Sequence, residues 1–371
     1  MRAHDPGVFV LDKHFTLKGS PMFNPPFRKL PTIVVTALFA LFCAGAIAQE
    51  TVTISPNYQF SRTSNFRHAL GTANPHAREG MNKINALADA GAAAAAPDSG
   101  GPRYPADLEY LGGPTVPTAQ HHAIFVNPTS SCAPNSCWGD PIGFLHDLNS
   151  SNFIHVTNQY VDTEHGHRYP VGTNYVISYP VTPGVPLTDA DMEVIAYAAA
   201  SSSGQNGYGH IYHVFLVPGQ DECFTSGFTV CYSPDNPATF AYCGYHSSFD
   251  VVGFGHVLYS VEPSVNVNGC NVRPGTPNGQ LADSTNNVLS HEVFETITDP
   301  DGSAWLNILD NGIFGAEIGD ECSFLLFTPN FINPTAAYFD PSNVTLNGKS
   351  YAVQPEYSNA GHACLTRIGD N

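Results

Sequence analysis

Basic residues are scarce in this chain of 371 residues. Lys and Arg number 14 against 32 Asp and Glu, which gives a formal net charge of −18 at pH 7. Nucleic acids and anionic membrane surfaces are bound through patches of basic side chains. After residue 120 the sequence supplies four basic residues, Arg168, Arg273, Lys349 and Arg367. Nucleic acids and anionic membrane surfaces are therefore excluded as partners.

Several motifs of known chemistry are also missing. No Cys-x-x-Cys occurs, which argues against a thiolate zinc site and against a thioredoxin-type redox site. No Gly-x-Ser-x-Gly supports the nucleophile elbow of a serine hydrolase. No P-loop or other Gly-rich phosphate loop follows a predicted strand, so nucleotide chemistry has no support either.

The N-terminal 48 residues have the pattern of a secretory leader. A basic pair precedes the apolar run "IVVTALFALFCAGAIA", which ends in an Ala-x-Ala exit at Ala48 and is too short to span a membrane comfortably. Met22 stands where an initiator would, so residues 1–21 are interpreted as lying before the true start. Cleavage after Ala48 would remove five basic and two acidic residues. The mature chain would then begin at Gln49, carry a net charge near −21 (−18 − 5 + 2), and have no membrane-inserted segment.

Cysteine is the main sign of an oxidising environment. Of the nine cysteines, Cys43 would leave with the leader, and an even number in an exported chain predicts disulfides. Eight cysteines allow 105 connectivities. The simplest hypothesis pairs neighbours along the sequence, as 132–137, 223–231, 243–270 and 322–364.

Residues 49–103 read as an extension ahead of a single domain at 104–371. The extension contains the low-complexity run "ALADAGAAAAAPDSGGP", which favours a linker or disordered arm, with a cleaved propeptide as the alternative. In the domain, "HHAIFVN", "HIYHVFLVPG" and "HVLYSVEPS" predict strands. Helices are predicted at "WGDPIGFLHDLNSS" and "LTDADMEVIAYAAASSS", the second capped by Thr188 or Asp189.

A third predicted helix, near residues 281–299, carries the chemistry. Asp283 or Ser284 is the expected N-cap, and Pro300 with Gly302 is expected to end the helix. Its sequence "LSHEVFETITDPDG" contains H-E-x-x-E where zinc proteases have H-E-x-x-H.

The spacing of this pentapeptide suits a metal site. His291 and Glu295 are four residues apart and lie on one helix face, so both can bind one metal ion. Glu292 lies about 100° further around the helix, where it can point at a water and act as general base. The alternative is an exposed surface helix that needs no function.

A second acidic segment, "GAEIGDEC", follows this helix, and its Glu317 lies 22 residues beyond Glu295. This order resembles the gluzincin arrangement, and by that resemblance Glu317 is the third metal ligand and Asp320 supports His291. The departure is Glu295, which replaces the second histidine of that class. Asp299 closes the helix or serves as a second supporting carboxylate.

One histidine and two carboxylates nearly neutralise a dication and weaken its pull on the pKa of a bound water. Zn²⁺ is the expected ion, and Mn²⁺ or Ca²⁺ also fits this oxygen-rich set. The other histidines have lesser expected roles. His210 and His213 are expected at a loop or strand surface, as are His165 and His167, and His246 in "YCGYHSSF" is a weak candidate for substrate contact.

Three segments together resemble the EXORDIUM-like (phosphate-induced protein) family and its microbial secreted relatives: "SHEVFETITDPDGSAWLN", "AEIGDEC" and "LNGKSYAVQPEYSNAGHAC". The family shows a comparable order of H-E-x-x-E, T-D-P, a Trp, E-I-x-D-x-C and a last Cys. The resemblance covers roughly residues 110–371 and is specific in the C-terminal part. It implies a secreted protein with a zincin-like core. In plants the family is linked to cell-wall-associated growth responses, without a firmly attached enzymatic activity.

These features predict an α+β, zincin-like fold, loop-rich and disulfide-stapled, whose mixed sheet packs on the active-site helix, with one or two further helices. The expected function is a secreted metal-dependent hydrolase, a zinc peptidase that acts on a protein or peptide. The competing hypothesis is a non-catalytic extracellular or cell-wall-associated binding or signalling protein that keeps a structural ion. An inert scaffold would bind no metal at all.

Overall fold

The computed structural model describes residues 34–36, 49–54, 62–71, 106–132, 134–161, 168–224, 227–308, 317–323, 338–339 and 341–367. The chain divides into two compact units, residues 1–32 and 33–371, and all described residues belong to the second unit. His165 and His167 lie outside the described residues, as does most of the predicted leader. Within the described part, no helix combines the length and the apolar character needed to cross a membrane.

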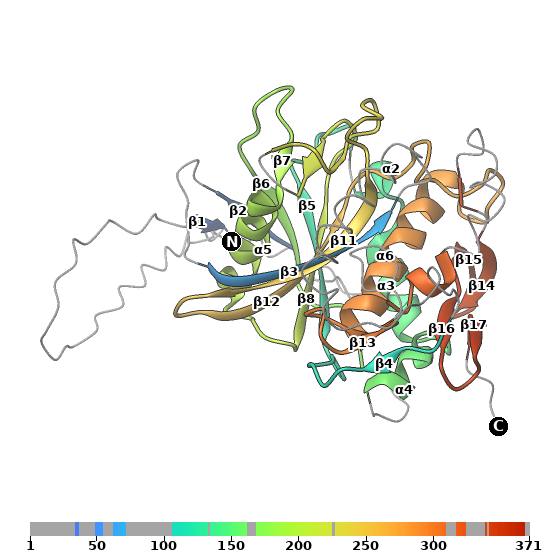
Figure 1. The fold of residues 1–371 in the computed structure, drawn as a ribbon. Coiled ribbons are helices and arrows are strands. Elements are labelled where there is room, and N and C mark those ends of the chain that lie inside the picture. The colour runs from blue at the N-terminus through green and yellow to red at the C-terminus, as the bar shows by residue number, and fades with distance from the viewer. Residues whose placement is uncertain are drawn as a thin grey trace, which may run out of the picture. The chain divides into compact units, whose positions relative to one another are not determined.

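An eight-stranded mixed sheet forms the centre of this unit (Figure 1). Five neighbouring strands, from β2 through β6, β5 and β8 to β12, run parallel, and β1, β11 and β3 are added antiparallel. In sheet order the strands are β1 (Val34–Thr36), β2 (Gln49–Thr53), β6 (Asn174–Ser178), β5 (Gln120–Val126), β8 (His210–Phe215), β12 (Gly255–Glu262), β11 (Tyr242–Val251) and β3 (Arg62–Gly71).

Smaller ladders surround this sheet. They comprise β10 (Cys231–Tyr232), β9 (Glu222–Cys223) and β7 (Leu187–Thr188); β13 (Trp305–Leu306) with β4 (Glu109–Tyr110); β14 (Ser342–Leu346) with β15 (Lys349–Val353); and β16 (Glu356–Ser358) with β17 (Ala363–Leu365). The helices are α2 (Pro134–Cys137), α3 (Pro141–Asn149), η1 (Ile154–Thr157), α4 (Asn158–Val161), α5 (Asp189–Ser203) and α6 (Gln280–Thr298), with a short helical turn at 320–323.

Two long helices cover the two faces of the sheet. The side chains of α5 pack in one hydrophobic core with the even-numbered positions of β5, and α6 contributes to a second core with the odd-numbered positions. Alternation along a strand sends successive side chains to opposite faces, which explains this division. The face under α5 is called the α5 face below, and the face under α6 is called the α6 face (Figure 1).

The predicted strands and helices of the domain are confirmed, as is a mixed sheet packed on a long helix. Thr188 caps α5 as predicted, since its backbone N–H donates to Asp191 Oδ2 at 2.7 Å. The predicted bounds of α6, 281–299, agree with the observed helix to within one residue, but the predicted N-cap, Asp283 or Ser284, was wrong. The helix begins at Gln280, after Gly279 at φ 84°. Asp283 instead accepts a hydrogen bond from the backbone of Asn278, so its carboxylate holds the preceding loop.

The four predicted disulfides are confirmed: Cys132–Cys137, Cys223–Cys231, Cys243–Cys270 and Cys322–Cys364. Parts of the predicted leader and extension also belong to the sheet. β1 lies in the leader, whereas β2 begins at Gln49, the predicted mature N-terminus. β3 comes from the extension and pairs along β11. Whether the extension is cleaved stays a prediction.

Candidate metal centre

The predicted site residues lie on a helix that is enclosed on every side. α6 packs against β11, β12, β15 and α3, and every residue from Asp283 to Thr298 is buried. His291, Glu292 and Glu295 each have an exposed fraction of 0%. The exposed-helix alternative is therefore wrong: this H-E-x-x-E is part of the core.

His291 and Glu295 meet as their spacing predicts. His291 Nε2 lies 2.9 Å from Glu295 Oε1 and 3.7 Å from Asp320 Oδ1. On the other side of the ring, Nδ1 lies 2.9 Å from Nε2 of Gln354. The same Gln354 amide donates to the carbonyl of Gly319 at 2.8 Å. Gln354 thus fixes the ring of His291 and ties it to the segment that carries Asp320.

A second histidine, His246 on β11, faces the same helix. Its Nδ1 lies 3.5 Å from Glu292 Oε2 and 3.5 Å from Glu295 Oε2. Its Nε2 lies 3.2 Å from the backbone carbonyl of Asp299 and 3.7 Å from Glu317 Oε2. His246 is fully buried, so it belongs to the acidic cluster and lies deeper than a substrate-contacting surface residue would.

Two groups of side chains in the described residues have a metal-binding arrangement. One comprises His246, Glu295 and Glu317, and the other His291, Glu295 and Asp320; within each group the ligand atoms lie within 4.8 Å of one another. The predicted ligands His291, Glu295 and Glu317 are all in this cluster, but they are divided between the two groups. Asp320, expected to support His291 from behind, faces the same Nε2 as Glu295. The assignment of individual ligands stays a prediction.

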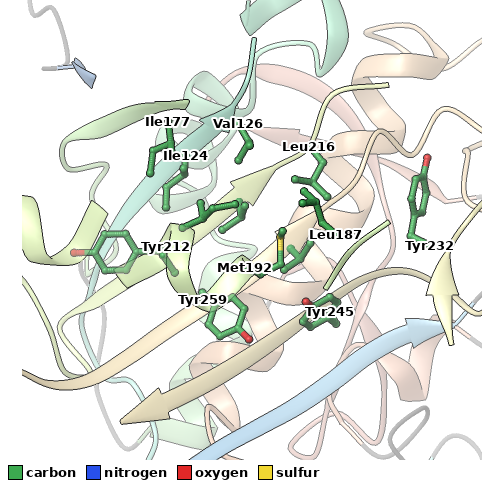
Figure 2. Close-up of a cluster of buried hydrophobic side chains, with 14 of the residues drawn as sticks. Ile124, Val126, Ile177, Leu187, Met192, Tyr212, Leu216, Tyr232, Tyr245 and Tyr259 are labelled. Carbon is green, nitrogen blue, oxygen red and sulfur yellow. The ribbon is translucent and has the colours of Figure 1, made fainter. Parts of the chain in front are cut away.

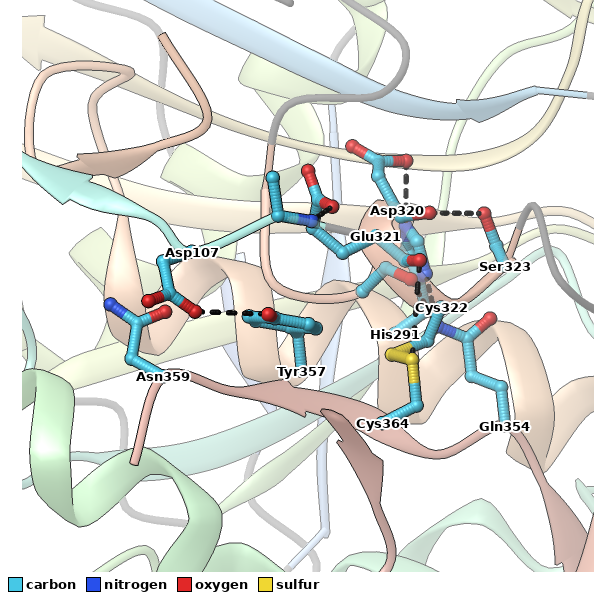
Figure 3. The surroundings of a disulfide bond; sticks show 12 residues. Asp107, His291, Asp320, Glu321, Cys322, Ser323, Gln354, Tyr357, Asn359 and Cys364 are labelled. Carbon is cyan, nitrogen blue, oxygen red and sulfur yellow. Dashed lines mark hydrogen bonds and ion pairs between the residues drawn. A yellow bond between two sulfur atoms is a disulfide. The ribbon is translucent and has the colours of Figure 1, made fainter. Parts of the chain in front are cut away.

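The segment at 317–323 reaches the helix because of its backbone and its disulfide. A Cβ on Gly319 would lie 2.4 Å from His291 Nδ1 and 3.0 Å from Glu295 Oε1, so only glycine allows this approach. The Cys322–Cys364 disulfide joins the segment to β17 (Figure 3). Glu321 turns away, since its carboxylate accepts from Asn307 Nδ2 at 2.7 Å and from the backbone N–H of Ala106 at 2.6 Å.

Burial dominates the electrostatics of the surrounding carboxyl groups. It raises the pKa of Glu262, on β12, to about 8, although Ser260 and His291 act in the opposite direction. Burial raises the pKa of Glu356 well above its usual range, and the charges of Glu295 and Asp320 raise it further. Carboxyl groups crowded without a cation favour their neutral forms.

Asp299 lies where α6 ends. Its Oδ1 accepts hydrogen bonds from the backbone N–H groups of Ser303 and Ala304, at 2.7 and 2.8 Å. Burial raises its pKa, partly offset by these bonds and by a hydrogen bond with Glu317. Asp299 therefore closes the helix and contacts Glu317, while its role as a supporting carboxylate of a metal site stays a prediction.

Sequence reasoning missed four members of the cluster: His246, Glu262, Gln354 and Glu356. They come from strands β11, β12 and β16 and from the residue after β15, and no short-range spacing links them to α6. Alternation was a usable signal for His246, because strand pairing places it beside Ser260 on the α6 face. The surface placement of His213 was wrong: it is fully buried, and its Nδ1 lies 2.7 Å from Ser260 Oγ.

Comparison of the chain with family models, with curated proteins and with solved structures gives no match. The resemblance to the EXORDIUM-like family thus stays a prediction.

Proposed function

We propose that this protein is a secreted metal-dependent hydrolase with a zincin-like core, and that it acts as a peptidase. The observation that carries the proposal is the meeting of His291 and Glu295 of α6 with Glu317 and Asp320 of the 317–323 segment, all of them buried. The EXORDIUM-like resemblance agrees with secretion and with this site. The four disulfides agree with an oxidising compartment.

The donor set fits a divalent cation. In a tetrahedral site with bonds of about 2.1 Å, neighbouring ligand atoms lie roughly 3.4 Å apart. The distances from His291 Nε2 to Glu295 and Asp320 are 2.9 and 3.7 Å, which bracket that value. Zn²⁺ remains the favoured ion, and Mn²⁺ or Ca²⁺ suits the oxygen-rich cluster as well.

A cation held here would polarise a substrate carbonyl and lower the pKa of a water. Glu292 is the residue to take a proton from the attacking water and to pass it to the leaving amine. A Cβ on Gly244 of β11 would lie 3.1 Å from Glu292 Oε1, so the strand backbone runs directly beside this carboxylate. His246 Nδ1, 3.5 Å from Glu292 Oε2, limits where the carboxylate can point.

Burial favours a second candidate, a non-catalytic extracellular or cell-wall-associated binding protein with a structural ion. None of the ligand candidates, nor Glu292, is more than 2% exposed. A catalytic site must admit a peptide and keep an open position for water, whereas a structural site is closed. Glu292 discriminates between the two, because a structural ion needs no carboxylate directed at water.

The test uses the purified secreted protein. Metal content is measured by plasma mass spectrometry, and hydrolysis is measured on labelled casein and on a mixed peptide library. Glu292→Gln should keep the ion and lose at least about 100-fold in rate. Glu193→Gln is the matched control: Glu193 is also a buried helical glutamate, but it lies on α5. A metal-loaded wild type without hydrolysis would favour the binding protein, and a wild type without metal would contradict both candidates.

A further inference from the structure

The carboxylate of Glu295 faces two histidines at once. Its Oε1 lies 2.9 Å from His291 Nε2, and its Oε2 lies 3.5 Å from His246 Nδ1. The two oxygens of a carboxylate point in different directions. Here Oε1 is directed to the imidazole of His291, and Oε2 is directed to the imidazole of His246. This is the arrangement of a carboxylate that bridges two cations.

Among the described residues, the two imidazoles fall in different metal-binding groups, and Glu295 is the shared member. Each group has its own second carboxylate: Asp320 Oδ1 lies 3.7 Å from His291 Nε2, and Glu317 Oε2 lies 3.7 Å from His246 Nε2, in a group whose ligand atoms all lie within 4.8 Å of one another. The cluster therefore contains two sets of one imidazole and one carboxylate, joined by Glu295.

The contacts of His246 suit a metal ligand. In the tautomer protonated at Nε2, the Nε2–H group donates a hydrogen bond to the Asp299 carbonyl at 3.2 Å, and the lone pair of Nδ1 is directed at Glu295. A backbone carbonyl on the far nitrogen is the usual support for a metal-ligating histidine. His291 has the side-chain amide of Gln354 in the corresponding place, with Gln354 Nε2 2.9 Å from His291 Nδ1.

The local charge also calls for more than one cation. Seven buried carboxyl groups belong to the cluster: Glu262, Glu292, Glu295, Asp299, Glu317, Asp320 and Glu356. If only the four whose oxygens face the two imidazoles (Glu292, Glu295, Glu317 and Asp320) are ionised and both histidines are neutral, one dication leaves a charge of −2 (−4 + 2) and two leave 0 (−4 + 4). Buried charge of one sign is costly unless it is paired, so the second ion gives the better balance.

We propose that the protein holds two divalent cations bridged by Glu295, one bound by His291 and Asp320 and the other by His246 and Glu317. The inference deepens the proposed function, on which it rests, because a pair of ions about 3.5–4 Å apart stabilises the attacking and the leaving atoms together. It also makes His246 a metal ligand, although this residue lies outside the H-E-x-x-E motif.

The experiment measures stoichiometry on the full secreted chain. Metal-free protein is dialysed against Zn²⁺ and analysed by plasma mass spectrometry. Wild type should retain two ions per chain, and His246→Ala and His291→Ala should each retain about one. The matched control is His362→Ala, at an exposed histidine next to Asp107, which should retain two. Near-ultraviolet circular dichroism shows which variants are folded.

A second measurement covers variants that do not fold. Wild type loaded with two equivalents of Mn²⁺ should give the broad paramagnetic resonance spectrum of an exchange-coupled pair. An isolated-ion spectrum, or saturation at one Zn²⁺ per chain, overturns the bridged pair and leaves the proposed function standing. Absence of any bound ion overturns both.

Discussion

The two faces of the central sheet bury carboxyl groups next to different side chains, tyrosines on the α5 face and histidines on the α6 face. On the α5 face, the Asp189 carboxylate accepts hydrogen bonds from the hydroxyls of Tyr245 and Tyr259, and Glu222 accepts from Tyr242 and Tyr245. Figure 2 shows Tyr245 and Tyr259 within this core, near Leu187 and Met192. On the α6 face, the carboxyl groups lie beside two imidazoles.

The two kinds of neighbour differ in their hydrogen-bonding capacity: a tyrosine hydroxyl can donate to a carboxylate, whereas one nitrogen of a neutral imidazole can only accept. A tyrosine hydroxyl donates a proton and satisfies a buried carboxylate without further partners. Burial and the nearby carboxylates raise the pKa values of Tyr245 and Tyr259 well above 10, so both keep that proton. A neutral imidazole has one nitrogen that only accepts, so it can join carboxylates in binding a cation. The α5 face therefore has the chemistry of a structural core, whereas the α6 face has a set of donor atoms that could hold a cation.

The largest effect is expected from removing the shared ligand. Glu295→Ala should abolish metal binding and, in the presence of metal, lower the free energy of unfolding by about 4 kcal/mol, the value for an ion at 1,000 times its Kd. Calorimetry with and without a chelator measures it. Chelator should destabilise wild type and leave the variant unchanged. If wild type contains no metal and both proteins melt at the same temperature, the α6 face does not bind a metal ion and the prediction is contradicted.

The disulfide next to the α6 site should matter more than a remote one. Replacing both Cys322 and Cys364 by Ser opens a loop of sequence separation 42, and the chain-entropy model gives about 4 kcal/mol. The control pair, Cys132 and Cys137, closes a separation of 5, for about 2 kcal/mol. Urea unfolding measures both. Only the first variant should bind metal more weakly, and equal metal affinity in both would separate the disulfide from the site.

Histidines on both faces should make the protein sensitive to acid. Burial lowers the pKa of His121, on the α6 face, to about 3 and that of His122, on the α5 face, to about 4, from 6.5. Below about pH 6.5, these histidines bind protons in the unfolded chain but stay neutral in the folded protein. The contribution of these two histidines to stability is therefore complete above pH 6.5 and is lost toward pH 4, by about 1.4 kcal/mol per pH unit for each histidine.

Urea unfolding between pH 7 and pH 4.5 checks the acid sensitivity. His122→Gln should reduce the slope of stability against pH, because it removes one histidine whose pKa is lowered in the folded protein. His362→Gln, at an exposed histidine, should leave the slope unchanged. A slope that is the same in all three proteins would show that the buried histidines do not cause it.

The smallest effect is expected on the α5 face. Tyr259→Phe removes one donor from Asp189, which should cost about 1–3 kcal/mol in the free energy of unfolding. Metal content should stay at the wild-type value, since the change lies across the sheet from α6. Tyr110→Phe, at an exposed tyrosine, serves as control. Loss of metal in Tyr259→Phe would show that the two faces are coupled.

Local pattern predicted the part of the site that one helix carries. His291 and Glu295 were found because a four-residue spacing fixes their neighbourhood before any tertiary contact forms. His246 and Glu356 were not found, because they reach the site through strand pairing and loop closure, which sequence spacing does not encode. The N-cap of α6 was missed for a related reason. Asp283 is a good capping residue in isolation, but here it is used by Asn278 and by the backbone N–H of Ala352.

The pairing of β3 with β11 has a consequence for access. β3 lies in the segment predicted as a linker or propeptide, and it covers the strand that carries His246. If proteolysis releases that segment, β11 becomes an edge strand with open backbone donors and acceptors next to the acidic cluster. An extended polypeptide can add to such an edge as a new strand. The backbone groups of β11 that pair with β3 in the full chain would then form a docking edge for such a polypeptide, and cleavage would make that change irreversible.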